Sequence, residues 1–218
     1  GTLDPLASGL LLVCVGRATK TIPQLQDGDK VYTGTIAFGA TTPCYDLERR
    51  IDSYYPFKHI TRELVEREAA AMCGTIEQVP PVFSAVKVNG QRAYKCAREN
   101  AAEVEVKAKT VVIYSFDITA FSPATTTFEV LPSIAQPDGE APQRGLYKDP
   151  QGVVPDGLPT AAFRIACGKG TYVRSMVRDL GLALDSGAVL TSLRRERVGD
   201  YSLQQAVGPD NLDDFGGF

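Results

Sequence analysis

The chain has 218 residues, 44% of them hydrophobic, and a formal net charge of −3 at pH 7. This length supports one sizeable hydrophobic core, or one domain with an elaboration of it. The longest apolar stretch, residues 9–15, is far shorter than the roughly 20 residues that cross a bilayer, and no basic segment precedes it as in a signal peptide. We therefore expect a single domain that works in the cytoplasm.

The cysteines and the charge distribution narrow the classes of function. The five cysteines are scattered without a C-x-x-C pair, and His59 is the one histidine, so the sequence favours neither a disulfide framework nor a metal site. We expect no metal and no cofactor. A net negative charge argues weakly against nucleic-acid binding, but residues 160–200 carry seven basic and four acidic side chains. A one-sided basic face and scattered solvated charge are both compatible with this distribution.

The first predicted elements are a strand and a helix. Residues 30–39 alternate between apolar and small or polar side chains, which is typical of a strand. Thr61 is a suitable N-cap and Gly74 a suitable end for a helix whose apolar residues share one face. Three further strands are predicted at residues 110–118, 125–131 and 160–167, and a second helix at residues 171–184.

The order of these elements predicts the fold class. Strands outnumber helices and do not alternate regularly with them, which favours a mixed α+β sheet over a doubly wound parallel one. Between residues 131 and 160, six prolines and four glycines interrupt the pattern. We expect this segment to be an insertion that joins two strands.

The first nine residues place one carboxylate, Asp4, among apolar neighbours and directly before Pro5. A proline fixes its own φ and restricts the residue before it to extended geometry, so the backbone of Asp4 is held in place. An isolated Asp-Pro is usually a turn or cap residue. The surrounding motif decides whether Asp4 is such a turn or cap residue or a carboxylate with a function.

Four blocks form an ordered series. Residues 1–20 read GTLDPLASG and end in GRATK, and residues 31–39 read VYTGTIAFG with Thr42 and Asp46 after them. Residues 78–87 read QVPPVFSAVK, followed by Gly90 and RAY. Residues 167–176 read CGKGTYVRSM, followed by DLG and LRR, which ends at Arg195. Together these blocks resemble, in order and spacing, the TruB family of tRNA pseudouridine-55 synthases.

The resemblance implies an activity and a site. It implies that Asp4 is the nucleophile that adds to C1′ of the ribose or C6 of the uracil, and that Arg174 pairs with it. A uridine in folded RNA must be flipped into a pocket before chemistry can reach it. The other implied contacts are the pocket tyrosines Tyr32 and Tyr172, the apolar residue Leu193 and the phosphate-binding residue Lys20. Taken one by one, isolated tyrosines more often serve in strand and helix packing, and an isolated lysine is more often a solvated surface residue.

Arg174 also has a physical reason to stand beside Asp4. A nucleophilic carboxylate must stay ionised, and an apolar pocket disfavours its charged form. The planar guanidinium forms two parallel hydrogen bonds to a carboxylate, so it both stabilises the charge and orients the group. Arg178, one helical turn further on, is expected to be either a surface charge or a phosphate contact.

The resemblance also implies a domain organisation and a partner. We expect one pseudouridine-synthase domain over residues 1–218, with a mixed, mainly antiparallel sheet flanked by helices, the insertion at 131–160, the front of the domain missing and no C-terminal RNA-binding module. The expected activity is isomerisation of one uridine in the T arm of tRNA by a monomer. Cys44 stands where the family pattern has threonine, which removes no catalytic group.

Two other functions remain open. A guide-RNA-dependent pseudouridine synthase shares these motifs, although it normally carries a C-terminal RNA-binding module. An RNA-folding helper would use the tyrosines and basic residues for binding and would have lost, or not need, the chemistry. The presence of Asp4, Tyr32 and Arg174 together favours the enzyme.

Overall fold

The computed structural model describes residues 2–83, 87–88, 91–92, 106–125 and 153–208. Its strands are β1 (Ala7–Gly9), β2 (Lys30–Phe38), β3 (Ala40–Thr41), β4 (Ser53–Tyr54), β5 (Gly74–Gln78), β6 (Lys87–Val88), β7 (Gln91–Arg92), β8 (Lys109–Ser122), β9 (Thr160–Cys167), β10 (Ala188–Val198) and β11 (Tyr201–Ser202). Its α-helices are α1 (Ile22–Asp27), α2 (Arg62–Ala71) and α4 (Val173–Ala183), and its 3-10 helices are η1 (Gly16–Thr21) and η3 (Leu203–Gln205).

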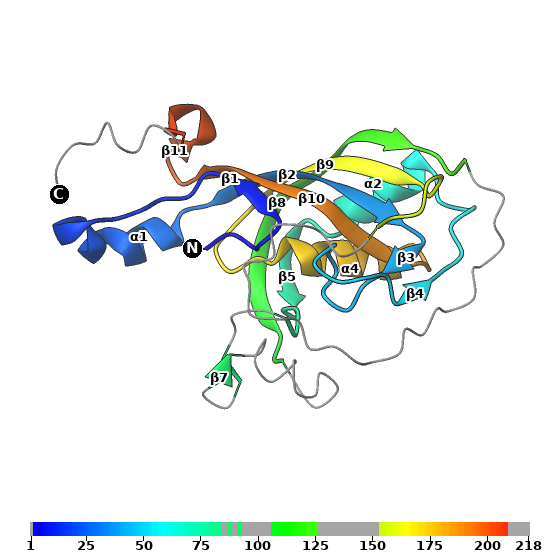
Figure 1. Cartoon of the computed structure of the whole chain (residues 1–218), viewed down its shortest axis with the longest axis horizontal. Helices are drawn as coiled ribbons and strands as arrows, with labels where there is room; N and C mark the ends of the chain where they lie inside the picture. The colour runs from blue at the N-terminus through cyan, green and yellow to red at the C-terminus, as the bar shows by residue number, and fades with distance from the viewer. Residues whose placement is uncertain (1, 84–86, 89–90, 93–105, 126–152, 209–218) are drawn as a thin grey trace.

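One sheet organises the domain (Figure 1). Its strand order is β1-β10-β2-β9-β8-β5, with β11 paired to the end of β10. Every neighbouring pair is antiparallel except β1 with β10, which is parallel. The predicted mixed, mainly antiparallel α+β sheet is therefore confirmed.

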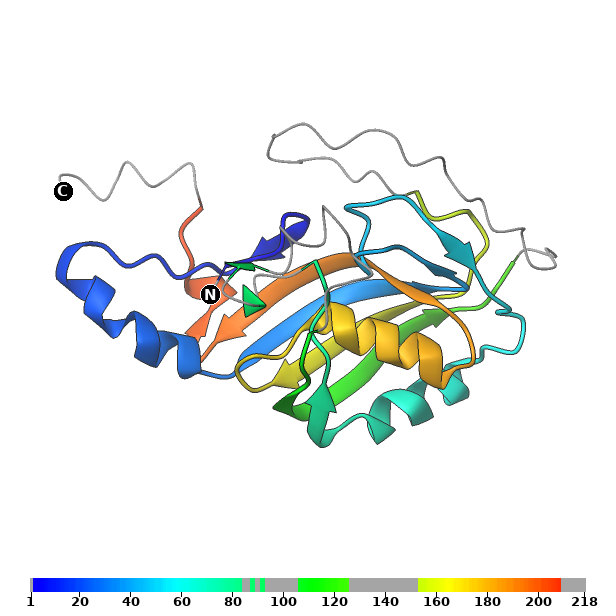
Figure 2. The same cartoon turned by 90° about the horizontal axis from the view of Figure 1, so that it is seen from below.

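Helices α2 and α4 lie against the same face of the sheet (Figure 2). The apolar side of α4, including Met176, Val177 and Leu180, is fully buried in the core. On the sheet, the rings of Phe116 and Phe163 meet edge to face with their centroids 5.9 Å apart. Among the described helices, none is long and apolar enough to span a membrane.

The expected helices and most expected strands are present. The hydroxyl of Thr61 caps α2 by accepting a hydrogen bond from the backbone N–H of Leu64 at 3.3 Å. The strand predicted at 110–118 continues to Ser122 as β8, and the strand at 160–167 coincides with β9. The strand predicted at 125–131 lies almost entirely outside the described residues.

Strand β10 is the longest of the elements that sequence patterning did not predict; β1, β5 and α1 are others. The charged stretch of β10 contains the LRR motif, and its side chains alternate between the two faces of the sheet. Leu193 and Arg195 lie on the inner side, whereas Arg194 is exposed on the other. A buried arginine in the alternating pattern conceals the strand from a hydrophobicity rule.

The proposed insertion follows β8 and precedes β9, which are paired antiparallel. Most of it, residues 131–152, lies outside the described part of the chain. Its last residues pack onto the domain: Leu158 belongs to the core, and the N–H of Thr125 donates to the carbonyl of Gly157 at 2.9 Å. The described end of the segment that joins the two strands is therefore packed on the domain before residue 160.

Candidate active site

Asp4 is presented by a tight turn at the edge of the sheet. The N–H of Ala7 donates to the carbonyl of Asp4 at 2.9 Å, which closes a turn with Pro5 at its second position. Proline suits this position because its fixed φ matches the turn. The turn leads directly into β1, so the pairing of β1 with β10 anchors the Asp4 backbone.

The guanidinium of Arg174 binds both oxygens of the Asp4 carboxylate. Nε donates to Oδ2 at 3.0 Å and Nη2 donates to Oδ1 at 3.1 Å. The Arg174 side chain is 5% exposed and the Asp4 side chain 38% exposed. The pair thus has a buried anchor and an accessible carboxylate, which is the arrangement that a positioned nucleophile requires.

A second carboxylate shares the same arginine. Asp46 Oδ2 lies 3.6 Å from Arg174 Nε, and the carbonyl of Cys44 accepts from Arg174 Nη1 at 3.2 Å. Burial acts to lower the pKa of Arg174, but the charges of Asp4 and Asp46 outweigh it and the pKa is raised. The guanidinium therefore stays charged although it is buried.

Asp46 is itself held by its neighbours in the chain. The thiol of Cys44 donates to Asp46 Oδ1 at 3.0 Å, and the backbone N–H of Glu48 donates to the same atom at 2.9 Å. Burial, together with the negative charge of Asp46, raises the pKa of the Cys44 thiol to about 12. The thiol is consequently a permanent hydrogen-bond donor at neutral pH.

The five residues central to the implied site line one cleft of about 420 Å³. They are Asp4, Tyr32, Tyr172, Arg174 and Leu193. They come from the turn before β1, from β2, from the start of α4 and from β10. Residues separated by up to 189 positions in the sequence are thus brought together, while their roles in chemistry and binding stay predictions.

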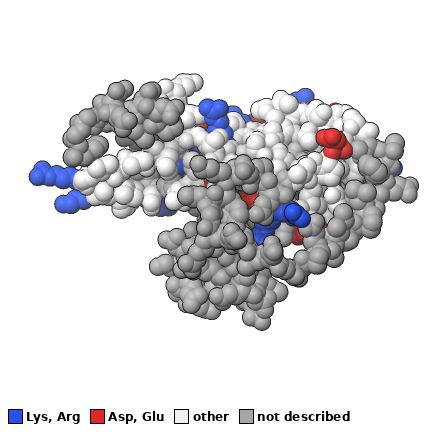
Figure 3. Space-filling view, viewed as in Figure 1, with Lys and Arg blue, Asp and Glu red and all other residues white. Residues whose placement is uncertain are grey.

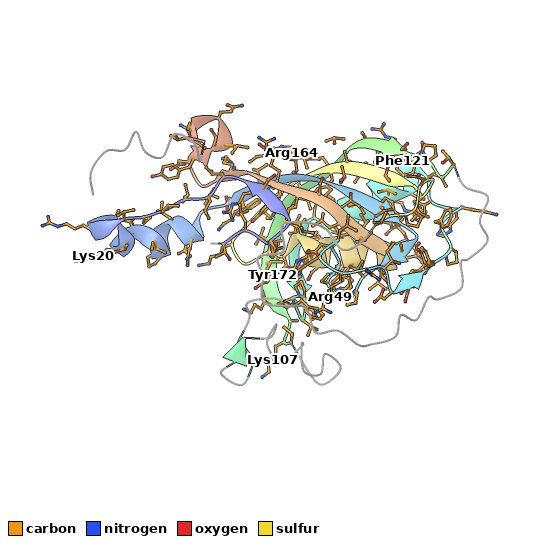
Figure 4. The ribbon with its side chains drawn as sticks, in the orientation of Figure 1. Lys20, Arg49, Lys107, Phe121, Arg164 and Tyr172 are labelled. Atoms are coloured by element: carbon orange, nitrogen blue, oxygen red, sulfur yellow. The ribbon has the colours of Figure 1, made fainter. Side chains whose placement is uncertain are left out.

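Tyr172 is fixed at the start of α4 by a buried amide. The side chain of Gln78 accepts from the N–H of Tyr172 at 2.8 Å and donates to its carbonyl at 3.2 Å. Ser175 adds a hydrogen bond from its hydroxyl to the carbonyl of Val79 at 2.8 Å. The block that begins at Gln78 therefore holds the start of α4, which forms one wall of the cleft. Tyr172 lies near the middle of the molecule (Figure 4).

Tyr32 lies on β2 between the core and the cleft. Burial raises the pKa of its hydroxyl, and hydrogen bonding to Arg195 opposes the shift. Arg195 is 3% exposed, and its Nε donates to the carbonyl of Leu10 at 2.8 Å. Arg195 thus links the wall of the cleft to the segment that carries Asp4.

Lys20 is the one predicted site residue that the structure leaves outside the cleft. It is exposed on η1, at the far end of the arm formed by residues 16–27 (Figure 4). Arg178, in contrast, lies on α4, with Nε 2.7 Å from Asp179 Oδ1 and its guanidinium over the ring of Tyr45. Lys20 can meet RNA only if the substrate extends beyond the cleft.

Sequence reasoning assigned no role to three charged residues at the site. In the sequence, Asp46 and Arg195 stand out only as parts of motifs, and Lys30 only as the start of a strand. The signal for Lys30 was available: it stands two residues before Tyr32, so both side chains point to the same face of the strand. Among the described residues, no three His, Cys, Asp or Glu side chains are grouped to hold a metal ion.

The amino-acid sequence matches one protein family over most of its length. Residues 1–134 match the family model described as "TruB family pseudouridylate synthase (N terminal domain)". A tRNA pseudouridine synthase B of Parabacteroides distasonis is 44% identical over 215 residues, which cover 99% of this chain and 76% of the relative. The protein of the same name from Bacteroides fragilis is 44% identical over 209 residues, covering 96% of this chain and 74% of the relative.

A solved structure shares the fold at much lower identity. A crystal structure of a Cbf5-Nop10-Gar1 complex aligns with a TM-score of 0.59 and 22% identity, covering 99% of this chain and 44% of that chain. The extent of the sequence match to the family model and to the two relatives establishes that the chain belongs to the TruB family of pseudouridylate synthases.

Proposed function

We propose that this protein isomerises a uridine of tRNA to pseudouridine. The observation that carries the proposal is the two-point ion pair between Arg174 and Asp4 at the wall of a cleft large enough for a nucleotide. The relatives that match nearly the whole chain are named tRNA pseudouridine synthase B, which supports tRNA as the substrate.

The proposed chemistry needs one nucleophile and a uracil ring that is held in the cleft. The Asp4 carboxylate adds to C1′ of the ribose or to C6 of the uracil, and the N1–C1′ bond breaks. The uracil turns within the cleft, C5 bonds to C1′, and the bond that Asp4 made to C1′ or C6 breaks and frees the carboxylate. The C5 proton leaves to water and N1 gains a proton. Tyr32, Tyr172 and Leu193 would hold the flipped ring by stacking and apolar contact, since the reaction needs it to stay in the site while it turns.

Three finer statements belong to the same proposal. The T arm is the part of tRNA that the family resemblance implies. We propose that the protein works in the cytoplasm, where tRNA is available, and that it acts as a monomer, because every group of the proposed site comes from one chain.

The test is release of tritium from tRNA labelled at uracil C5, compared between the parent and Asp4→Asn. The substitution keeps the size of the side chain but removes the nucleophile, so release should vanish while RNA affinity falls little. Asp117→Asn, an exposed carboxylate on β8, is the matched control and should retain parental turnover. If Asp4→Asn released tritium at the parental rate, the RNA-binding function would replace the enzymatic one.

A further inference from the structure

Lys30 is a buried cation in the wall of the cleft that the proposed chemistry does not use. The residue is 9% exposed, and its Nζ donates to the carbonyl of Gln26 at 2.6 Å. It forms no ion pair with any carboxylate among the residues that the structure describes. A buried ammonium without a counter-charge is costly, because desolvation is not repaid by a paired anion.

The carboxylates near Lys30 are engaged elsewhere. Asp27 binds Lys169 at 2.8 Å, and Asp29 accepts from the hydroxyl of Tyr114 at 3.0 Å. The charged side chains that line the cleft are Asp4, Lys30, Arg174 and Arg195. Arg174 is shared by the carboxylates of Asp4 and Asp46, so the positive charges of Lys30 and Arg195 are what remains on the Lys30 side of the cleft.

The strand register gives this charge a definite place relative to the pocket for the base. Lys30 and Tyr32 share the inner face of β2, and two residues along a strand span roughly 6.6 Å. On the neighbouring strand β10, Arg195 lies opposite Tyr32, and Leu193 lies opposite Gly34. The cleft therefore passes from an apolar end at Leu193, across Tyr32, to a cationic end at Lys30.

We propose that Lys30, with the positive charge of Arg195 beside it, binds a backbone phosphate directly adjoining the target nucleotide. This inference rests on the proposed function, because a flipped nucleotide whose base lies at Tyr32 carries its ribose and phosphate toward one end of the cleft. A phosphodiester supplies an anion in direct contact with the ammonium and accepts the two ammonium hydrogens that Gln26 does not use. Lys30 would thus anchor the backbone while the base turns.

The test combines a protein variant in which an uncharged side chain replaces Lys30 with RNAs in which one phosphate is replaced by an uncharged group. An RNA stem-loop of the T arm is prepared unmodified, and with a methylphosphonate at the phosphate either 5′ or 3′ of the target uridine. Dissociation constants are measured for the parent, Lys30→Met and Lys58→Met, an exposed lysine that serves as the matched control. For the parent, one of the two methylphosphonates should weaken binding about tenfold, as expected for a lost charge-assisted hydrogen bond.

Whether Lys30 contacts the phosphate is decided by the coupling between the Lys30→Met substitution and the methylphosphonate. Lys30→Met should weaken binding of the unmodified RNA about tenfold, lower the salt slope by about one unit and make binding insensitive to that same methylphosphonate. Lys58→Met should keep the parental sensitivity. If the effects of Lys30→Met and of both methylphosphonates were additive, Lys30 would only cap the carbonyl of Gln26 and the inference would be wrong.

Two checks distinguish loss of the phosphate contact from misfolding of the variant and from failure of the proposed function. Thermal unfolding verifies that Lys30→Met is folded, and Lys30→Gln provides a second neutral variant that retains a donor. Tritium release by the parent is measured on tRNA in parallel. Absence of release would contradict the proposed function, whereas release without any coupling at either phosphate would contradict the phosphate site alone.

Discussion

Gly9 packs directly against the main chain of Arg195. A β-carbon at residue 9 would lie 2.3 Å from the carbonyl oxygen and 2.7 Å from the nitrogen of Arg195, and the φ of Gly9 is +101°. This contact is the place where the segment bearing Asp4 joins strand β10. The glycine is therefore required both for its backbone conformation and for the close approach of two main chains.

Gly9→Ala should separate the two strands and displace Asp4. Gly16→Ala is the matched control, because Gly16 also has a positive φ, +58°, but nothing lies within 4 Å of its added β-carbon. We expect Gly9→Ala to lower the free energy of unfolding by about 2 kcal/mol more than the control, since only Gly9 is overpacked. Denaturant unfolding measures this difference, and equal losses would show that β1 adapts freely.

Arg174→Lys should keep the positive charge and lose the two parallel hydrogen bonds that the guanidinium makes to Asp4. A single ammonium cannot reproduce both hydrogen bonds to Asp4 and the contact with the Cys44 carbonyl, so turnover should fall about 100-fold or more. Arg178→Lys, one turn along α4, removes only the interactions with Asp179 and Tyr45 and should change turnover little. Steady-state rates of the two variants decide the matter; similar rates would mean that Arg174 acts only as a charge.

Stability should fall in alkaline solution because two thiols are buried. Burial raises the pKa of Cys44 to about 12 and that of Cys167 to about 11, from an ordinary value of 9.0. Above pH 9 the unfolded chain therefore holds fewer protons than the folded one, so the free energy of unfolding decreases as pH rises toward 11.

Cys44→Ser tests this dependence and the role of Cys44 at once. Serine keeps a donor for Asp46 but does not ionise in this range, so the variant should lose less stability between about pH 8 and about pH 10.5 than the parent. Its turnover should stay close to the parental rate, whereas Cys44→Ala should lower turnover by freeing Asp46. Urea unfolding at the two pH values measures the dependence, and an unchanged slope would argue against a buried thiol.

Lys20→Ala should affect binding without affecting chemistry. Basic side chains mark the tip of the arm formed by residues 16–27 in Figure 3, and Lys20 lies there, away from the cleft. If it meets an RNA phosphate, the variant should bind tRNA more weakly and lower the salt slope by about one unit, with unchanged kcat. Lys58→Ala is the control, and a reduced kcat would instead place Lys20 in the catalytic step.

The sequence predicted which residues line the cleft better than it predicted the residues that hold them in place. Asp4, Tyr32 and Arg174 were recognisable because their motifs are specific, and α2 and α4 because their apolar residues repeat at helical spacing. The hydrogen bonds between Gln78 and Tyr172 join residues 94 positions apart, and no local pattern encodes such a pair. Arg195 and Lys30 look like surface charges in the sequence. Strand alternation puts Lys30 on the face of Tyr32, but only the packing of the structure shows that both side chains are buried.

The position of β10 in the sheet has a consequence for biosynthesis. Among the strands that the structure describes, β1 pairs with β10 alone, and Ala7 lies opposite Leu193. On the ribosome, at roughly 5 to 20 residues per second, the first strand would wait about 10 to 40 seconds before its partner is made. Until then the nascent segment bearing Asp4 cannot be locked next to Arg174, so we expect catalytic competence to emerge late in translation, in one step.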